Sequence, residues 1–288
     1  MTDVVAQESE ARALTRQARA ETARALSRSA TFWIGCAVIL FWAACAVLGE
    51  WIAPQDPYAV SEEVFAAPSS EHWLGTDKNG RDVLSRVLVG ARDVLVIAPL
   101  ATLLGVAAGT LLGLLTGFFR RADDVLSRII EAVLAIPLII LAVVCLTAIG
   151  TSNAAVILVI GLVFAPIVAR TVRSAVLAER ELDYVQAARL RGERSWYLMA
   201  VEVLPNVTGP ILVETTIRLG YAIFAVVTLS FIGFGPQPPS PDWGTQITDQ
   251  YAYLEQAWWA VLFPALAIAS LVVAVNLVSD AIQQVVDR

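Results

Sequence analysis

Long apolar stretches with few or no charges alternate with charged segments along this 288-residue chain. A bilayer's hydrocarbon core is about 30 Å thick and a helix rises about 1.5 Å per residue, so roughly 20 apolar residues cross it. Stretches close to this length predict six membrane-spanning helices, at residues 32–49, 94–119, 132–149, 154–169, 210–235 and 257–278. The pattern therefore indicates an all-α, polytopic membrane protein.

Two of these spans come from one uncharged run, residues 132–169, which is too long for a single helix. Gly150, Thr151, Ser152 and Asn153 form a turn cluster inside it, so we expect two short helices there. The arginines before the first span are also typical of a secretory signal. No small-x-small cleavage site follows before Glu50, so we expect this span to be retained.

Basic residues decide the orientation, because Lys and Arg are held on the cytoplasmic side of short loops. Fifteen arginines lie in the tail 1–31, in the segment between the second and third spans, in the loop 170–205 and at the chain end. Only Lys78, Arg81, Arg86 and Arg92 lie in the opposite segment, 54–93. We expect both termini and the loop 170–205 to be cytoplasmic, with the membrane domain over residues 32–288.

The outer segment 54–93 carries a short helical pattern next to the second span. Val83, Leu84, Val87 and Leu88 recur at helical spacing opposite Arg81, Asp82, Ser85 and Arg86. This predicts an interfacial helix with a solvated polar face. It is interpreted as a structural lead-in to the second span, and a binding role is the alternative.

Composition agrees with a lipid environment and excludes several kinds of chemistry. Hydrophobic residues make up 57% of the chain and charged residues 16%, against about 25% in soluble domains. The net charge of -6, without a basic aromatic stripe, argues against nucleic acid as a partner. Three isolated cysteines (Cys36, Cys45, Cys145) and one histidine (His72) indicate no metal site. The single lysine, Lys78, is outside any GxxxxGK[ST] motif, so no nucleotide site is expected on this chain.

Two features inside the spans are candidate functional positions. Gly105, Gly109, Gly113 and Gly117 repeat every four residues, which predicts close packing against another helix; a hinge or a pore-lining strip is the alternative. Glu214 and Arg218 lie four residues apart in the fifth span. They are interpreted as a self-neutralised ion pair, with the lining of an aqueous pathway as the alternative.

The loop 170–205 is the most informative region. Its residues favour two helices separated by a turn at Gly192, which suits a left-handed helix cap. The segment from Tyr184 to Gly192 would expose a short helix with a smooth face at Ala187 and Ala188, shaped to enter a groove on a soluble partner. Contact with lipid headgroups is the alternative.

These residues resemble a known family. Gln186-Ala-Ala-x-x-x-Gly192, followed by Val203-Leu-Pro-Asn206, is similar to the EAA loop of binding-protein-dependent ABC importer permeases, with Gln186 in place of glutamate. Further segments resemble the C-type permease of dipeptide and oligopeptide importers, and the likeness covers residues 73–288. They are Leu74-Gly-Thr-Asp77, Gly80 to Arg86, Leu229 to Gly235 with Gln237-Pro-Pro, Trp243-Gly244, and Asn276-Leu with Asp280.

The resemblance implies a type I ABC importer permease fold, similar to MetI, in a bacterial cytoplasmic membrane. It implies that Tyr184, Gln186, Ala187, Ala188, Gly192, Leu204 and Pro205 contact an ATPase subunit. It also implies a homologous second permease, two ATPase subunits that hold ATP and magnesium, an extracytoplasmic solute-binding protein and a peptide cargo. Residues 235–256, with Trp243 and Tyr251, would form an outer gate, a docking surface or an aromatic belt.

Other functions are weaker alternatives. The same importer class also carries glutathione or nickel chelates. An ion-coupled secondary transporter would need carboxylates at the membrane midplane and an internal repeat, and neither is evident. An intramembrane enzyme would need a nucleophile with a base, paired aspartates or metal ligands at membrane depth.

Overall fold

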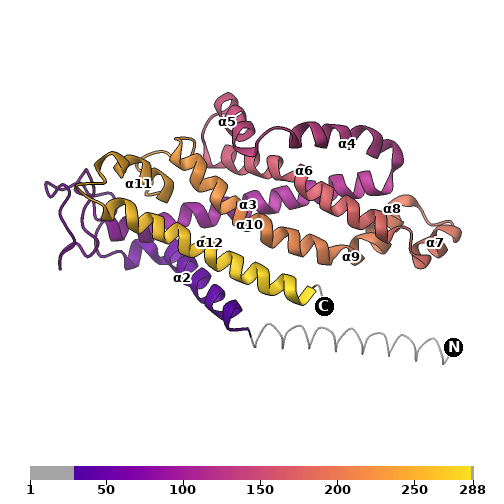
Figure 1. Cartoon of the computed structure of the whole chain (residues 1–288), viewed down its shortest axis with the longest axis horizontal. Coiled ribbons are helices and arrows are strands. Elements are labelled where there is room, and N and C mark those ends of the chain that lie inside the picture. Colours follow the sequence, from indigo (N-terminus) through magenta and orange to yellow (C-terminus); the bar gives the residue numbers. More distant parts are fainter. Residues whose placement is uncertain (1–28, 287–288) are drawn as a thin grey trace.

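The computed structural model describes residues 29–286, and the regular elements of this part of the chain are helices. Figure 1 shows the longest of them side by side along one axis. The longer helices are α2 (Ala30–Ile52), α3 (Val83–Phe118), α4 (Arg120–Leu134), α5 (Leu138–Ile149), α6 (Asn153–Glu179), α10 (Thr208–Phe231) and α12 (Trp259–Val286). The shorter ones are α7 (Asp183–Leu190), α8 (Ser195–Tyr197), the π-helix η1 (Leu198–Val203), α9 (Leu204–Asn206), α11 (Trp243–Gln250) and the 3-10 helix η2 (Tyr251–Tyr253).

Five helices of the described part are long and apolar enough to cross a membrane, namely α2, α3, α6, α10 and α12. The pair α4 and α5 adds a sixth if it counts as one span, but the two helices are bent by 94°. The prediction of one continuous helix over residues 132–149 is therefore wrong. Pro137 lies at the break, where its missing N–H and its ring disfavour helix continuation from Ile136. With 12 residues, α5 is about 18 Å long and too short to span alone.

Two helices continue beyond the predicted spans. The interfacial helix expected near Val83 is the first part of α3, which runs without interruption to Phe118. At the other end of the bundle, α6 continues to Glu179, so Arg170 and Arg173 lie on this helix rather than in a connector. Apolarity marks only the lipid-embedded part of a helix, whereas hydrogen bonding continues into water.

The four-residue glycine repeat of α3 faces α6 along its length. A Cβ added at Gly109 would lie 2.6 Å from the Ala165 carbonyl oxygen, and one added at Gly113 would lie 2.8 Å from that of Ala169. Gly105 and Gly117 face α6 in the same way. Small residues let two backbones approach where lipid gives no hydrophobic drive for association. The α3–α6 pair is thus the tightly packed axis of the bundle.

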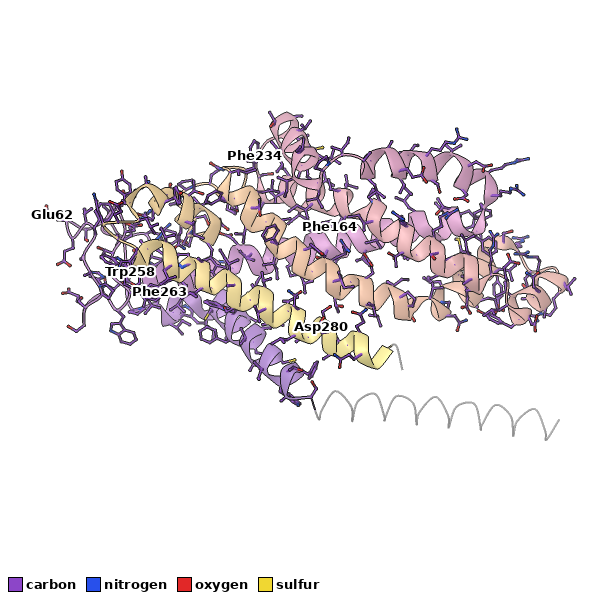
Figure 2. The ribbon with its side chains drawn as sticks, in the orientation of Figure 1. Glu62, Phe164, Phe234, Trp258, Phe263 and Asp280 are labelled. Atoms are coloured by element: carbon purple, nitrogen blue, oxygen red, sulfur yellow. The ribbon has the colours of Figure 1, made fainter. Side chains whose placement is uncertain are left out.

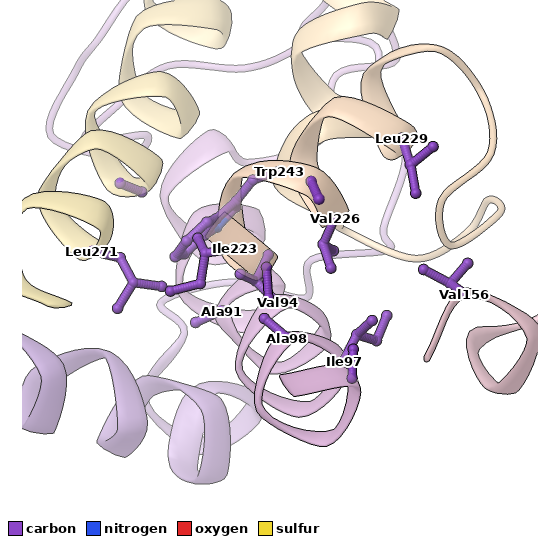
Figure 3. Packing of buried hydrophobic residues seen from close by; sticks show 14 of the residues in the cluster. Ala91, Val94, Ile97, Ala98, Val156, Ile223, Val226, Leu229, Trp243 and Leu271 are labelled. Atoms are coloured by element: carbon purple, nitrogen blue, oxygen red, sulfur yellow. The ribbon is translucent and has the colours of Figure 1, made fainter. Parts of the chain in front are cut away.

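The main apolar core is built from residues of α2, α3, α5, α6, α10, α11 and α12, and Figure 3 shows part of it. Trp243, at the start of α11, is fully buried there, and its Nε1 donates to the Val87 carbonyl oxygen at 2.8 Å. Its ring meets Trp42 of α2 edge-on, with centroids 4.9 Å apart. Trp243 is therefore a core residue, and the interpretation of this side chain as part of an outer docking surface is wrong. Tyr251, by contrast, is 64% exposed.

Aromatic side chains also mark one end of α12. Trp258 and Phe263 lie near its beginning and Asp280 near its other end (Figure 2). The rings of Trp258 and Phe263 are 6.3 Å apart, and Trp258 is half-exposed. This placement is typical of an aromatic belt at headgroup level.

The polar face expected to be solvated at the start of α3 is buried. Asp82 caps α3 by accepting from the Ser85 backbone N–H at 2.8 Å, and its other oxygen lies 3.0 Å from His72 Nδ1. Arg86 donates to the Pro57 carbonyl oxygen at 3.0 Å, and Asp77 pairs with Arg81 at 2.7 Å. The segment before α3 and helix α11 cover this face. The expectation of a solvated face at Arg81, Asp82, Ser85 and Arg86 is wrong, because Asp77, His72 and Pro57 in the preceding segment, and the Asp82–Ser85 contact itself, satisfy these groups.

Asp242 caps α11 at the end of the bundle opposite α7 (Figure 1). Its side chain is fully buried and accepts from the Thr245 backbone N–H at 3.0 Å. Burial raises the pKa of Asp242 from 3.8 to about 6. Because the folded-state pKa is the higher one, the native state binds more protons, and its stability falls as pH rises through this interval.

We expect the thermal unfolding midpoint to be higher near pH 5 than near pH 7.5 because of this group. The full pKa difference corresponds to about 3 kcal/mol, of which about half is lost between pH 5 and pH 7.5. The variant Asp242→Asn keeps an oxygen that can accept at the cap and should lose most of this dependence. Unfolding curves of both proteins in detergent check this, and equal pH dependence in the two would contradict it.

Candidate functional site

Helix α7 lies at the end of the bundle opposite α11, next to α8 and α9 (Figure 1). Its side chains Val185 and Ala188 are buried. Val185 joins a second apolar cluster with residues of α3, α6 and η1. The other members of this cluster are Leu114, Val168, Val172, Val176, Met199, Val203 and Val207. The helix is therefore attached to the membrane bundle by one apolar stripe.

The opposite face of α7 is open. Ala187 is exposed, and Leu190 is 90% exposed at the tip of the helix, with the half-exposed Trp196 following on α8. Gly192 follows with φ of 80°, in the left-handed conformation expected of a helix cap, and nothing lies within 4 Å of the position that an added Cβ would take. Leu190 and Trp196 therefore leave two large apolar side chains exposed at this end of the bundle.

The remaining predicted coupling residues lie around α7 in different roles. The Gln186 side chain donates to the Arg180 carbonyl oxygen at 3.1 Å, so it closes the turn before α7. Leu204 is partly buried and Pro205 is exposed, and both belong to α9. The structure brings these residues together with Tyr184 and Gly192 at one end of the bundle.

Tyr184 joins three segments through its hydroxyl. It donates to Glu179 Oε1 at 2.5 Å, at the end of α6, and accepts from Asn206 Nδ2 at 2.9 Å. Loss of water around the hydroxyl, and the bond to Glu179, raise the pKa of Tyr184 to about 12. The hydroxyl is therefore a neutral donor at physiological pH.

Three residues near α7 were not among the predicted site residues. Arg180 Nη1 donates to the Gly117 carbonyl oxygen at 2.7 Å, at the end of α3, where a cation suits the negative end of the helix dipole. Glu179 and Asn206 hold Tyr184. The only sequence signal was for Asn206, which directly follows Leu204 and Pro205.

Glu214 and Arg218 form an ion pair inside the bundle, away from α7. Arg218 Nε lies 2.7 Å from Glu214 Oε1, one α10 turn away, and both side chains are largely buried. Thr171 of α6 donates to Glu214 at 3.3 Å. The Arg218 guanidinium also lies 4.8 Å from the Tyr221 ring and 6.0 Å from that of Phe164, which lies near the middle of the bundle (Figure 2). The predicted site residues thus do not form a single site.

The family of the chain follows from comparison with known proteins. Residues 105–288, more than half of the chain, match the model of the binding-protein-dependent transport system inner membrane component. The chain belongs to this family. Residues 19–68 also match the N-terminal transmembrane domain of oligopeptide transport permease C. The resemblance noted in the EAA loop is thereby confirmed, and the chain is a multi-pass permease subunit of an ABC transporter.

Relatives of this permease share most of its length. The di/tripeptide transport system permease protein DppC of Pseudomonas aeruginosa is 38% identical over 82% of this chain and 81% of its own. The glutathione transport system permease protein GsiD of Pectobacterium atrosepticum is 34% identical over 83% and 80%. A chain of the inward-facing MetNI methionine ABC transporter superimposes with a TM-score of 0.58 at 22% identity, covering 70% of this permease and 97% of that chain. This last similarity concerns the fold.

Proposed function

We propose that this permease belongs to an ATP-driven importer that carries di- or oligopeptides across the cytoplasmic membrane. The match to oligopeptide transport permease C and the name of the Pseudomonas relative support a peptide cargo. The glutathione permease among the relatives makes glutathione the alternative cargo within the same class.

The observation that carries the proposal is the exposed coupling helix α7. Its inner face is buried against the spans, while Leu190 at its tip is 90% exposed. A soluble ATPase subunit would cover this tip, so that closure of two such subunits around ATP and magnesium moves α7. A homologous second permease would complete the pathway, and a solute-binding protein would deliver cargo to the opposite face. The arginine distribution supports a cytoplasmic location for both termini and for α7.

The intramembrane ion pair has a structural role in this proposal. Glu214 and Arg218 neutralise each other on one helix, and Thr171 connects the pair to α6. The guanidinium is further shielded by the Tyr221 ring. A charge satisfied in this way stabilises contact between α10 and α6 without requiring water.

The proposal is tested by uptake into proteoliposomes that contain this permease with the second permease and ATPases encoded beside it. Binding protein loaded with a labelled dipeptide, a longer peptide or glutathione is added outside, with ATP inside. We expect ATP-dependent accumulation of a peptide. Accumulation without the ATPases, or accumulation driven by a proton or sodium gradient, would contradict the proposal. Accumulation of glutathione but of neither peptide would identify glutathione as the cargo.

A further inference from the structure

The hydrogen bonds around Tyr184 connect α7 to the chain segment that enters α10. Asn206 donates to the Tyr184 hydroxyl at 2.9 Å and, through the same nitrogen, to the Glu202 carbonyl oxygen at 2.7 Å. Asn206 is the last residue of α9, and α10 begins at Thr208. A displacement of Tyr184 therefore acts on the backbone immediately before a membrane span.

The local backbone explains why a side chain supplies this connection. The segment before α10 passes from the π-helix η1 into α9, and Pro205 in α9 has no backbone N–H to donate. The helical hydrogen-bond pattern is therefore irregular here, and π-helical turns occur often at functional sites. The Asn206 amide bonds the Glu202 carbonyl and thereby fixes its own side chain toward Tyr184.

The other contacts of α7 differ in character. Val185 and Ala188 make apolar contacts, which resist separation but have little directional preference. Arg191 and Glu202 pair at 3.7 Å with the arginine side chain 59% exposed, where an ion pair contributes little. The Gln186 side chain returns to the turn before α7. A directional bond from α7 itself to α9, directly before α10, is made at Tyr184.

We infer that Tyr184 and Asn206 are positioning residues that transmit movement of α7 to α10 when the ATPase subunits close. This inference rests on the proposed function. Glu179, the acceptor of the Tyr184 hydroxyl hydrogen, orients that hydroxyl so that its lone pair faces Asn206. The hydroxyl thus connects α7 both to the end of α6 and to the segment before α10, while docking of the ATPase depends on the exposed tip at Leu190.

The test uses the complete complex in proteoliposomes and measures cargo imported per ATP hydrolysed. Tyr184→Phe removes the hydroxyl and keeps the ring, and Asn206→Ala removes the amide. We expect each to lower the ratio about three- to tenfold while the ATPase subunits still copurify. The matched control is Tyr197→Phe on α8, which loses an exposed hydroxyl. Its ratio should equal that of the wild type.

The double variant separates one shared contact from two independent effects. If Tyr184 and Asn206 act through their mutual bond, the double variant should be no worse than the more impaired single variant. Losses that multiply would overturn the inference. A Tyr184→Phe ratio equal to that of the Tyr197→Phe control, or a parallel loss of bound ATPase and transport, would overturn it as well.

Failure of the proposed function gives a different result. A wild-type complex that shows no ATP-dependent uptake contradicts the importer itself, before any variant is compared. If the wild-type complex imports cargo at the expense of ATP and the Tyr184→Phe complex imports as much cargo per ATP, only the role of this contact is contradicted.

Discussion

Replacement of Gly192 by valine is expected to lower import per ATP hydrolysed by about tenfold while the permease still inserts and assembles. Gly192 has φ of 80°, a conformation that a β-branched residue adopts at a cost of about 1–3 kcal/mol. No atom lies near the position of an added Cβ, so the effect arises from backbone strain and not from a clash. The strain acts on the cap of α7 and shifts its exposed tip. Uptake and ATP hydrolysis in proteoliposomes measure the ratio.

Two variants control for this interpretation. Gly192→Asn should stay close to wild type, because asparagine tolerates the left-handed conformation. Gly233→Val introduces the same kind of strain at the other end of α10, where φ is 89° and an added Cβ again meets nothing. Its import per ATP should remain near that of the wild type. An equal fall for valine at both positions would show that strain alone, and not its location in the coupling loop, causes the loss.

Local signals were sufficient to predict α7. The loop was expected to form helices separated by a turn, and α7 ends at Leu190, two residues before the glycine with positive φ. The same holds for the glycine repeat of α3, because spacing by four residues places all four glycines on one side of a helix. Capping and helical periodicity depend on neighbours in sequence, which is why they could be predicted without a fold.

Contacts between distant segments could not be predicted in this way. The buried polar face of α3 depends on the contacts of Asp82 with His72 and of Arg86 with Gln246 of α11, which tertiary structure sets and helical periodicity does not reveal. Asn206 meets Tyr184 only because α7 turns back toward η1. The break before α5 is a different case. Pro137 is a signal for a helix break in the sequence itself, but the uncharged residues on both sides of it are typical of one membrane span.

Packing of α3 on α6 leads to the largest expected effect on folding. An alanine at Gly109 would place its Cβ 2.5 Å from the Val168 Cβ and 2.6 Å from the Ala165 carbonyl oxygen, so the two helices must move apart. We expect Gly109→Ala to destabilise the protein by about 1–3 kcal/mol, the usual cost of overpacking, and Gly109→Leu to prevent a monodisperse fold. The midpoint of heat-induced aggregation in detergent measures this.

Ala107 provides the matched control, because it lies on the same helix but its side chain is exposed and does not face α6. Ala107→Leu should therefore leave the aggregation midpoint unchanged. The comparison also separates packing from the hinge or pore-lining alternative for the glycines. A Gly109→Ala protein as stable as wild type but altered in transport would support a hinge, since a hinge needs backbone freedom and not close approach. A Gly109→Ala protein that loses stability but keeps its import per ATP would instead support the packing role. The close contact between the α3 and α6 backbones is then what holds the two helices together, because lipid tails are as apolar as the side chains and give no hydrophobic drive for association.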